Sequence, residues 1–284
     1  MPADQPTLAN GDRPIVIDDP NDPRIAAFRD IRERDLIGRH GQFIVEGTVV
    51  LRMLAAAQKN GTDFRARSIL ILENRLAGVA DILADVPADV PVYVATATVL
   101  DTIVGFHLHR GILALGERIA RPGPSALAAT LPPQALVVAG CGLSNHDNMG
   151  SMFRNAAAFM ADAVFLDATS CDPLYRKALR VSVGSVLSVP YQRGGSALAM
   201  LETLAAEGFH IWSLSPAGTT EIRQIPPSSR MALVIGTEGD GLPGDVLARF
   251  RTARIAQSRQ LDSLNAGTAC GLALYQMAAA MGRL

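Results

Sequence analysis

The feature that most constrains the fold of this chain is the alternation, in its second half, of short apolar runs with longer stretches of helical character. Strands are expected at residues 135–139, 163–167, 210–214, 232–236 and 253–255, and helices near 149–160, 173–180, 195–207 and 263–282. Strands and helices that alternate in this way form a mostly parallel sheet with helices on both faces. The sequence therefore predicts an α/β fold for this half.

The first half predicts a second, smaller α/β layer domain. The spacing of Ile25, Phe28, Ile31 and Leu36 predicts a helix over residues 23–37. Other helices are expected at 48–59 and 75–84, and strands at 43–47, 68–73, 92–95 and 111–115. Proline and glycine are concentrated between the two halves, which marks a linker. The expected organisation is a flexible leader at 1–20, a small domain at 21–118, a linker at 119–133 and a larger domain at 134–284.

Length and composition narrow the class of protein. The 284 residues, of which 49% are hydrophobic, suffice for two globular domains. No apolar run approaches the roughly 20 residues that a membrane-spanning helix needs, and no secretory signal is expected. The cysteines, Cys141, Cys171 and Cys270, are far apart, which predicts buried thiols in a reducing cytoplasm and no metal site.

The net charge of −1 means that any surface for nucleic acid must be local, because binding to phosphates calls for a basic excess. The candidate surface comprises Arg24, Arg29, Arg32, Arg34, Arg39 and His40. The alternative is a solvated helix face, since Asp30, Glu33 and Asp35 balance the same stretch. The sequence leaves both interpretations open.

Three segments place polar residues at the end of an apolar strand or the start of a helix, where α/β folds carry their sites. They are Asn148-Met-Gly-Ser-Met-Phe-Arg154, Gly236-Thr-Glu238-Gly-Asp-Gly241 and Ser263-Leu264-Asn265. Taken singly, each has a structural explanation: a capping Asn with an exposed Arg, a tight turn, and a helix that begins with Ser263 as its N-cap. Capping does not explain Asn265, which is expected inside the first turn of that helix.

Taken together, the three segments resemble the three motifs of the SpoU (TrmH-like) family of RNA ribose 2′-O-methyltransferases, in the SPOUT superfamily. The stretch Lys177-Ala-Leu-Arg180-Val-Ser182-Val-Gly184 is similar to a fourth family segment, and the order and spacing agree over residues 135–284. Upstream, Arg39-His-Gly-Gln-Phe-Ile-Val-Glu46-Gly47 and His109-Arg110-Gly111 resemble the L30e-like substrate-binding domain that precedes the catalytic domain in many members.

The resemblance implies a SPOUT catalytic domain with a parallel sheet and a C-terminal trefoil knot, which general topology rules would exclude. It also implies a homodimer and S-adenosyl-L-methionine as cofactor. Backbone groups of Gly236, Ile255 and Leu264 would contact the adenosine of the cofactor, with the side chain of Gln257 beside them. The last helix carries small residues such as Gly267 and Gly271 that permit close approach of a neighbour.

The resemblance further implies catalytic roles for Arg154, Asn148, Glu238, Ser263 and Asn265. Arg154 would stand at the ribose 2′-hydroxyl, and the other four would orient Arg154, the target phosphate and the cofactor. A guanidinium stays protonated at neutral pH and is a poor base. Arg154 is therefore expected to stabilise the developing alkoxide rather than to remove the proton.

One segment departs from the family pattern, which has Ile-Pro-Met where this chain has Ile255-Ala256-Gln257. This change motivates one alternative, a non-catalytic RNA-binding protein that kept the fold. Another alternative is an α/β nucleotide-binding enzyme unrelated to methyl transfer, although no phosphate-binding fingerprint occurs in the sequence. The expected substrate is RNA, with ribosomal RNA favoured over transfer RNA, and neither DNA nor a membrane is an expected partner.

Overall fold

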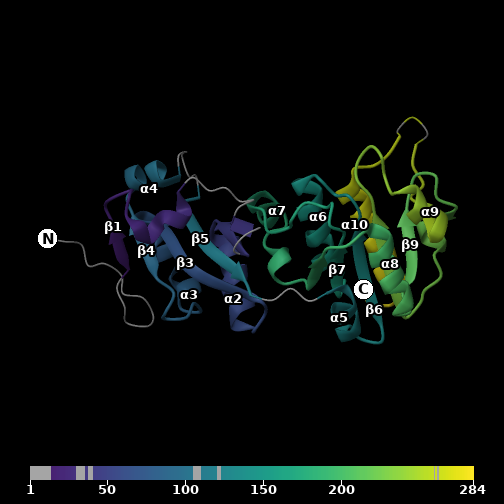
Figure 1. Ribbon diagram of the computed structural model, residues 1–284, viewed down its shortest axis with the longest axis horizontal. Helices are drawn as coiled ribbons and strands as arrows, with labels where there is room; N and C mark the ends of the chain where they lie inside the picture. The colour runs from purple at the N-terminus through teal and green to yellow at the C-terminus, as the bar shows by residue number, and fades with distance from the viewer. Residues whose placement is uncertain are drawn as a thin grey trace. The chain divides into compact units, whose positions relative to one another are not determined.

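The computed structural model describes residues 14–29, 36–37, 41–104, 110–119, 123–258, 260 and 262–284. These residues form two compact units (Figure 1). Unit 1 takes its residues from Met1–Ala120 and Leu174–Leu187, and unit 2 from Arg121–Pro173 and Ser188–Leu284. Most of the leader expected at 1–20 lies outside the described residues, as do Arg32, Arg34, Arg39, His40 and His109.

Unit 1 is built on a mixed sheet with the strand order β1-β4-β3-β5-β2. Its strands are β1 Ile15–Ile17, β2 Gln42–Glu46, β3 Phe64–Leu72, β4 Val92–Ala95 and β5 Ile112–Arg118. Strand β4 runs parallel to β1 and β3, while β5 runs antiparallel to β2 and β3. Its helices are α2 Thr48–Lys59, α3 Ala80–Leu83, α4 Ala97–Val104 and α7 Arg176–Val181, with 3-10 turns η1 Pro23–Phe28, η3 Glu73–Arg75, η4 Ala77–Val79 and η5 Ser185–Leu187.

The helix expected over residues 23–37 is wrong in its extent. The 3-10 turn η1 ends at Phe28, and Arg29 already has extended backbone angles (φ −91°, ψ 141°). Residues 30–35 lie outside the described part of the chain. Ile25 and Phe28 are nevertheless fully buried. The apolar spacing thus identified core residues correctly, because a 3-10 turn also brings residues three apart onto one face.

Residues Leu174–Leu187 group with unit 1, whereas the sequence pattern placed them in the larger domain. Helix α7 packs on β2, and Gly184 lies against α2. A Cβ on Gly184 would stand 2.6 Å from Cγ of Met53, and the φ of Gly184 is +84°. Only glycine fits both this contact and this backbone conformation, which gives the Ser182-x-Gly184 pattern a structural cause. Val183 has φ 49°, a strained conformation for a β-branched residue.

Unit 2 is built on a seven-stranded sheet, all of whose paired strands run parallel, in the order β10-β12-β9-β11-β6-β7-β8. Its strands are β6 Ala135–Gly140, β7 Ala163–Leu166, β8 Tyr191–Arg193, β9 His210–Leu214, β10 Thr220–Glu221, β11 Arg230–Ile235 and β12 Arg251–Arg254. Its helices are α5 Pro124–Thr130, α6 His146–Ala158, α8 Ala197–Ala206, α9 Gly244–Arg249 and α10 Ala266–Ala280, with the 3-10 turn η6 Ile222–Gln224.

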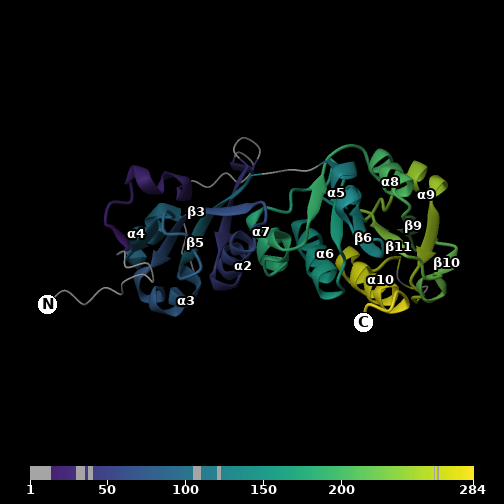
Figure 2. The same ribbon diagram turned by 90° about the horizontal axis from the view of Figure 1, so that it is seen from below.

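Helices cover both faces of this sheet: α5, α8 and α9 lie on one side, and α6 and α10 on the other (Figure 2). The predicted parallel α/β fold is confirmed. Strands β8 and β10 and helix α9 were not predicted, because elements this short show no clear periodicity. Helix α5 lies in the stretch expected as a linker, where Pro124 occupies its first turn and Leu127 and Ala128 are buried. The trefoil knot remains a prediction.

A polar clasp joins the end of α10 to the start of the sheet. Arg283 forms an ion pair with Asp162 (Nη2–Oδ2 2.7 Å) just before β7 and donates to the carbonyl oxygen of Gln134 just before β6. The same Oδ2 of Asp162 accepts a hydrogen bond from the backbone N–H of Leu136. This clasp lies at the amino ends of the strands, and the predicted site residues lie towards their carboxyl ends.

Among the described residues, no helix is long and apolar enough to cross a membrane.

Candidate active site

The glycine-rich segment after β11 forms a turn that folds back on itself. Thr237 and Gly241 form an isolated antiparallel bridge. A Cβ on Gly236 would stand 2.5 Å from the carbonyl carbon and oxygen of Gly241, so no larger residue fits there. The turn therefore needs glycine at position 236 for close approach of the backbone, and it leaves Glu238 exposed.

A cavity lies at the carboxyl ends of β9, β11 and β12, beside the start of α10. It is lined by Leu214, Ser215, Pro216, Ile235, Gly236, Thr237, Glu238, Gly239, Gly241, Ile255, Gln257, Ser263, Leu264, Ala266 and Ala269. The structure thus brings together the four residues expected to bind cofactor with two of the expected catalytic residues, Glu238 and Ser263. Ser215 and Thr237 also line it and were missed, although each follows an apolar strand, which was an available signal.

Asn265 joins the cavity to helix α6. Its Nδ2 donates to Oδ1 of Asn148 (2.8 Å) and to Oε1 of Glu238 (2.7 Å). Its Oδ1 accepts from the backbone N–H of Thr268 (3.1 Å), which makes Asn265 the N-cap of α10. The expectation that Ser263 is the N-cap, with Asn265 inside the first turn, is therefore wrong. One amide both caps a helix and links two predicted site residues that are far apart in sequence.

Helix α6 carries Asn148 and Arg154. Asn145 caps this helix by accepting from the N–H of Asp147, so Asn148 lies in the first turn rather than at the cap. Asn148 is 4% exposed, whereas Arg154 is exposed and forms no hydrogen bond or ion pair with another residue that the structure describes. Neither residue lines the cavity. The structure connects Asn148 to the site through Asn265 and leaves the guanidinium of Arg154 open to an external partner.

Two glycines of α10 set its distance from α6. A Cβ on Gly267 would stand 2.7 Å from Cβ of Ser151, and one on Gly271 would stand 3.1 Å from Nδ2 of Asn155. Asn155 also donates to the carbonyl oxygen of Gly267 (2.8 Å). The expectation that small residues on the last helix permit close approach of a neighbour is confirmed for these two positions. Ser151 and Asn155 flank Arg154 along α6, so this contact helps to place Arg154.

None of the three cysteine thiols is activated as a nucleophile. Burial raises the pKa of Cys141 and of Cys270 to about 12, and that of Cys171 to about 11. A thiol with a raised pKa is a weak nucleophile at neutral pH. Within the residues that the structure describes, no group of three or more His, Cys, Asp or Glu side chains is placed to hold a metal ion.

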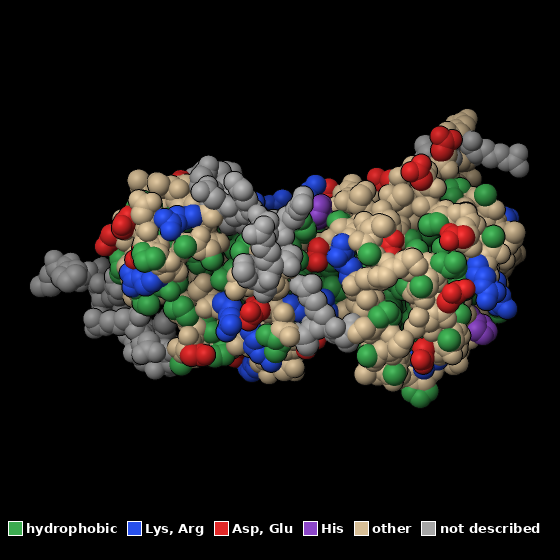
Figure 3. All heavy atoms as spheres, in the orientation of Figure 1, with side chains coloured by type: hydrophobic (Ala, Val, Ile, Leu, Met, Phe, Trp, Pro, Cys, Tyr) green, Lys and Arg blue, Asp and Glu red, His purple; other side chains and the backbone are tan. Residues whose placement is uncertain are grey.

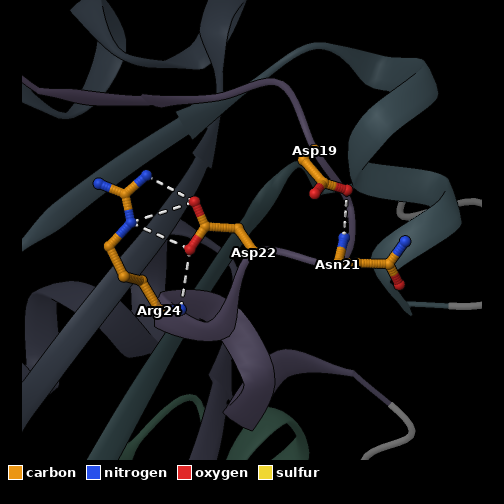
Figure 4. A network of polar contacts seen from close by, with 4 residues as sticks. All are labelled: Asp19, Asn21, Asp22 and Arg24. Atoms are coloured by element: carbon orange, nitrogen blue, oxygen red, sulfur yellow. Dashed lines mark hydrogen bonds and ion pairs between the residues drawn. The ribbon is translucent and has the colours of Figure 1, made fainter.

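In the described part of the expected basic surface, Arg24 is paired with an acidic residue, whereas Arg29 donates a hydrogen bond to the neutral amide of Asn21. Arg24 binds the carboxylate of Asp22 through Nε and Nη2, with an Nη2–Oδ2 distance of 2.5 Å (Figure 4). Hydrogen bonds from Arg24 lower the pKa of Asp22 to about 2. On the face shown in Figure 3, Lys and Arg side chains are interspersed with Asp, Glu and hydrophobic ones.

A denser group of cations in unit 1 surrounds Glu46, whose side chain is nearly buried. Arg110, Arg176 and Arg180 lie 4.0, 3.7 and 3.7 Å from its carboxylate. Three guanidinium groups thus face this one carboxylate. We call Arg110, Arg176 and Arg180 the arginine cluster.

Comparison with known proteins agrees with this geometry. Residues 135–275 match the model of the SpoU rRNA methylase family. The chain is 38% identical over 267 residues to an uncharacterized tRNA/rRNA methyltransferase of Mycobacterium bovis, an alignment that covers 91% of this chain and 89% of the relative. Its fold is similar to the crystal structure of an AdoMet-bound rRNA methyltransferase from Sinorhizobium meliloti (TM-score 0.75, 23% identity, 92% and 96% of the two chains). It is also similar to the crystal structure of an RNA 2′-O ribose methyltransferase (TM-score 0.72, 23% identity, 95% and 99%).

Proposed function

This chain belongs to the SpoU rRNA methylase family, and we propose that it is an RNA methyltransferase that acts on a ribose 2′-hydroxyl with S-adenosyl-L-methionine as cofactor. The observation that carries the proposal is the junction at Asn265, which joins Asn148 to Glu238 at the edge of the cavity. The relative named as a tRNA/rRNA methyltransferase and the AdoMet-bound neighbour support the RNA substrate and the cofactor. The family motifs and the neighbour named as a 2′-O ribose methyltransferase support the 2′-hydroxyl as acceptor.

The cavity suits an adenosine-containing cofactor. Leu214 and Leu264 give the cavity apolar lining, and the backbone at Gly236 and Ile255 offers N–H and C=O groups that can match the edge of adenine. We assign the adenosine to these residues, with the amide of Gln257 in the same wall. When bound, the cofactor supplies a methyl group on a sulfonium, which is already a good leaving group.

Arg154 carries the central catalytic role. Negative charge develops on the ribose 2′-oxygen as its proton passes to solvent, and a fixed cation beside the oxygen stabilises that charge while the oxygen bonds to the methyl carbon and the neutral thioether leaves. An exposed guanidinium can also hold a neighbouring phosphate with two parallel hydrogen bonds. Asn148, Asn265 and Glu238 hold the start of α6 against the cavity, and Ser263 orients the substrate from the cavity wall.

The test compares Arg154→Ala with Arg249→Ala, a matched control at an exposed arginine of the same unit that lies 3.8 Å from Glu202. Transfer of a labelled methyl group to RNA should fall at least about 100-fold in Arg154→Ala, since loss of one group that stabilises the transition-state charge costs that much. Calorimetry should show cofactor affinity within about twofold in both variants, because Arg154 does not line the cavity. Retained turnover in Arg154→Ala would overturn the assignment.

The RNA target is proposed to be ribosomal, with transfer RNA as the alternative. Deleting the gene and mapping 2′-O-methyl groups across total RNA tests this directly. Loss of the methyl group from one ribosomal nucleotide would support the proposal. Loss of a methyl group from a transfer RNA would instead make transfer RNA the substrate.

A non-catalytic RNA-binding protein is the second candidate, favoured by Ala256-Gln257 in place of the family's Pro-Met. Calorimetry with the purified chain separates the two. If S-adenosyl-L-methionine showed no detectable binding at millimolar concentration, the proposal that the chain is an enzyme would be refuted.

We also propose that the chain acts as a homodimer through the outer face of α10. Leu272 and Tyr275 are 47% and 55% exposed there, and the ring of Tyr275 contacts Phe159 (centroids 5.7 Å apart). Met160 is also 47% exposed. Grouped exposed apolar side chains are typical of a self-association surface. Tyr275→Asp should therefore convert a dimer to a monomer in sedimentation velocity, and a wild-type monomer would refute this interface.

Unit 1 is proposed to contact RNA through the arginine cluster. Its guanidinium groups are suited to phosphates, which bind Lys and Arg in a salt-dependent way. Replacing Arg110 with Ala should weaken RNA binding and reduce its dependence on salt, while cofactor affinity stays unchanged. If the salt dependence of RNA binding were unaltered, the arginine cluster would be excluded as the RNA-binding surface.

A further inference from the structure

The strand β7 ends at a nearly buried carboxylate, Asp167, which is 5% exposed. It follows β7 as the glycine-rich turn follows β11, at the edge of the sheet where the cavity lies. A buried charge is costly unless its oxygens are satisfied. The sequence motifs give Asp167 no role, so its place in the site needs another explanation.

Four neutral donors satisfy the Asp167 carboxylate. Oδ1 accepts from the N–H of Gly142 (3.1 Å) and from both the N–H (2.9 Å) and the Oγ (2.6 Å) of Ser170. Oδ2 accepts from Oγ1 of Thr169. An ionised carboxylate is an acceptor with two oxygens, so it can bind this many donors at once. The side chain therefore ties its own loop to the loop that follows β6.

Further bonds make the two loops one rigid piece. The backbone N–H of Leu143 donates to Oγ of Ser170 (3.1 Å), and the N–H of Cys171 donates to the carbonyl oxygen of Leu143 (2.7 Å). From β8, Arg193 donates to the carbonyl oxygens of Ser170 and Ala168 (2.8 and 3.0 Å). The loops at the carboxyl ends of three neighbouring strands are thus held together.

The loop held by Asp167 leads directly into the site. It runs from Gly142 to Asn145, the cap of α6, and then to Asn148, whose Oδ1 accepts from Asn265. A Cβ on Gly142 would stand 4.0 Å from Cβ of Thr237, which lines the cavity. A shift of this loop would therefore move Asn148 and the cavity wall together.

We propose that Asp167 is a positioning residue for methyl transfer: its carboxylate fixes the loop after β6, so that α6 presents Asn148 to Asn265. This inference rests on the proposed function for its kinetic test. Asp167 acts through the loop and does not touch the substrate. A displacement of a site residue by about 1 Å can slow a reaction about 100-fold, which sets the scale of the effect.

The experiment compares Asp167→Ala with Asp162→Ala. Asp162 stands at the opposite end of the same strand, where it binds Arg283 and the N–H of Leu136. Both variants lose a partly or fully buried carboxylate, but only the first borders the site. We expect Asp167→Ala to lower kcat between about 10-fold and 100-fold, and Asp162→Ala to leave kcat unchanged at a temperature where both are folded. Equal kcat values for the two variants would overturn the proposal.

A double-mutant cycle shows whether Asp167 works through Asn148. If it does, Asp167→Ala combined with Asn148→Ala should be no slower than Asn148→Ala alone, because the group being positioned is already absent. If the two substitutions lowered kcat by factors that multiply in the double variant, Asp167 would not act through Asn148. Asp167→Asn keeps one acceptor oxygen for Gly142 and Ser170, so its kcat should return to within about threefold of wild type. This variant also serves if Asp167→Ala does not fold.

Hydrogen exchange supplies a readout that does not depend on activity. Amides of residues 141–150 should exchange faster in Asp167→Ala than in wild type, and Asp162→Ala should leave them protected. If the wild type shows no methyl transfer but this pattern holds, the proposed function fails while the positioning of the loop stands. Unchanged exchange over 141–150 in folded Asp167→Ala would refute the positioning itself.

Discussion

Replacement of Asn265 separates the two roles that its side chain combines. In Asn265→Ala, helix α10 loses its N-cap, which costs about 1 kcal/mol. The nearly buried Oδ1 of Asn148 also loses its donor, which costs about 1–3 kcal/mol. Glu238 is exposed and is hydrated instead. The free energy of unfolding should therefore fall by about 2–4 kcal/mol, the sum of these two terms.

Asn265→Asp keeps an acceptor for the N–H of Thr268, so the cap survives. A carboxylate at a helix N-terminus adds about 0.3–1 kcal/mol, which offsets repulsion from the exposed Glu238. The amide of Asn148 can turn its NH2 group towards the new carboxylate. We expect this variant to stay within about 1 kcal/mol of wild type. It nevertheless lacks the N–H group that joins Asn148 to Glu238, so methyl transfer should fall at least about 10-fold in both variants.

Urea unfolding measures the free energies, and a labelled-methyl assay measures turnover. Ser196→Ala is the matched control, because Ser196 caps α8 by accepting from the N–H of Ala199 and lies outside the cavity. It should lose about 1 kcal/mol and keep its turnover. If Asn265→Asp were as unstable as Asn265→Ala, the assignment of the cap would be refuted. Wild-type turnover in Asn265→Asp would refute the role of its N–H group in the site.

Four further outcomes are expected. Gln257→Met should tighten cofactor binding severalfold in calorimetry, because an apolar side chain then completes the cavity wall; weaker binding would contradict this. Val183→Gly should raise the free energy of unfolding by about 0.5–1 kcal/mol, since relief of a positive φ outweighs the added chain entropy; an equal or lower value in urea would contradict it. In the folded protein, Cys141, Cys171 and Cys270 should react slowly with iodoacetamide near pH 8, because burial raises their pKa values to about 12, 11 and 12 from 9.0; fast alkylation would contradict this. As pH rises from about 9 towards about 12, these thiols should lower the free energy of unfolding, because the unfolded chain ionises first.

The parallel sheet could be predicted because its central strands hold long apolar runs, such as residues 231–235 of β11, that the helical stretches separate clearly. The short edge strands could not, since Tyr191–Arg193 and Thr220–Glu221 hold too few residues for a period to show. The length of the first helix was overestimated because the spacing of Ile25 and Phe28 fits a 3-10 turn as well as an α-helix.

The candidate site was predictable as a set of strand ends and helix starts, but its connections were not. Asn265 was expected inside a helix because nothing local distinguishes it from Ser263 as a cap; the choice depends on Asn148 and Glu238, which are distant in sequence. Asp167 was overlooked for a similar reason. Its four donors come from its own loop and from the loop after β6, so its importance appears only when the two strands lie side by side.

The contact between α6 and α10 has a consequence for how related chains can diverge. Gly267 and Gly271 lie on Ser151 and Asn155, which are three residues before Arg154 and directly after it on α6. A methyl group gained at Gly267 would stand 2.7 Å from Cβ of Ser151 and would displace the helix that carries this arginine, and one gained at Gly271 would push on the side chain of Asn155. Substitutions at 267 and 271 should therefore be inherited only with compensating losses of volume at 151 and 155. An alignment of relatives would then show these four positions varying in pairs while Arg154 between them stays fixed.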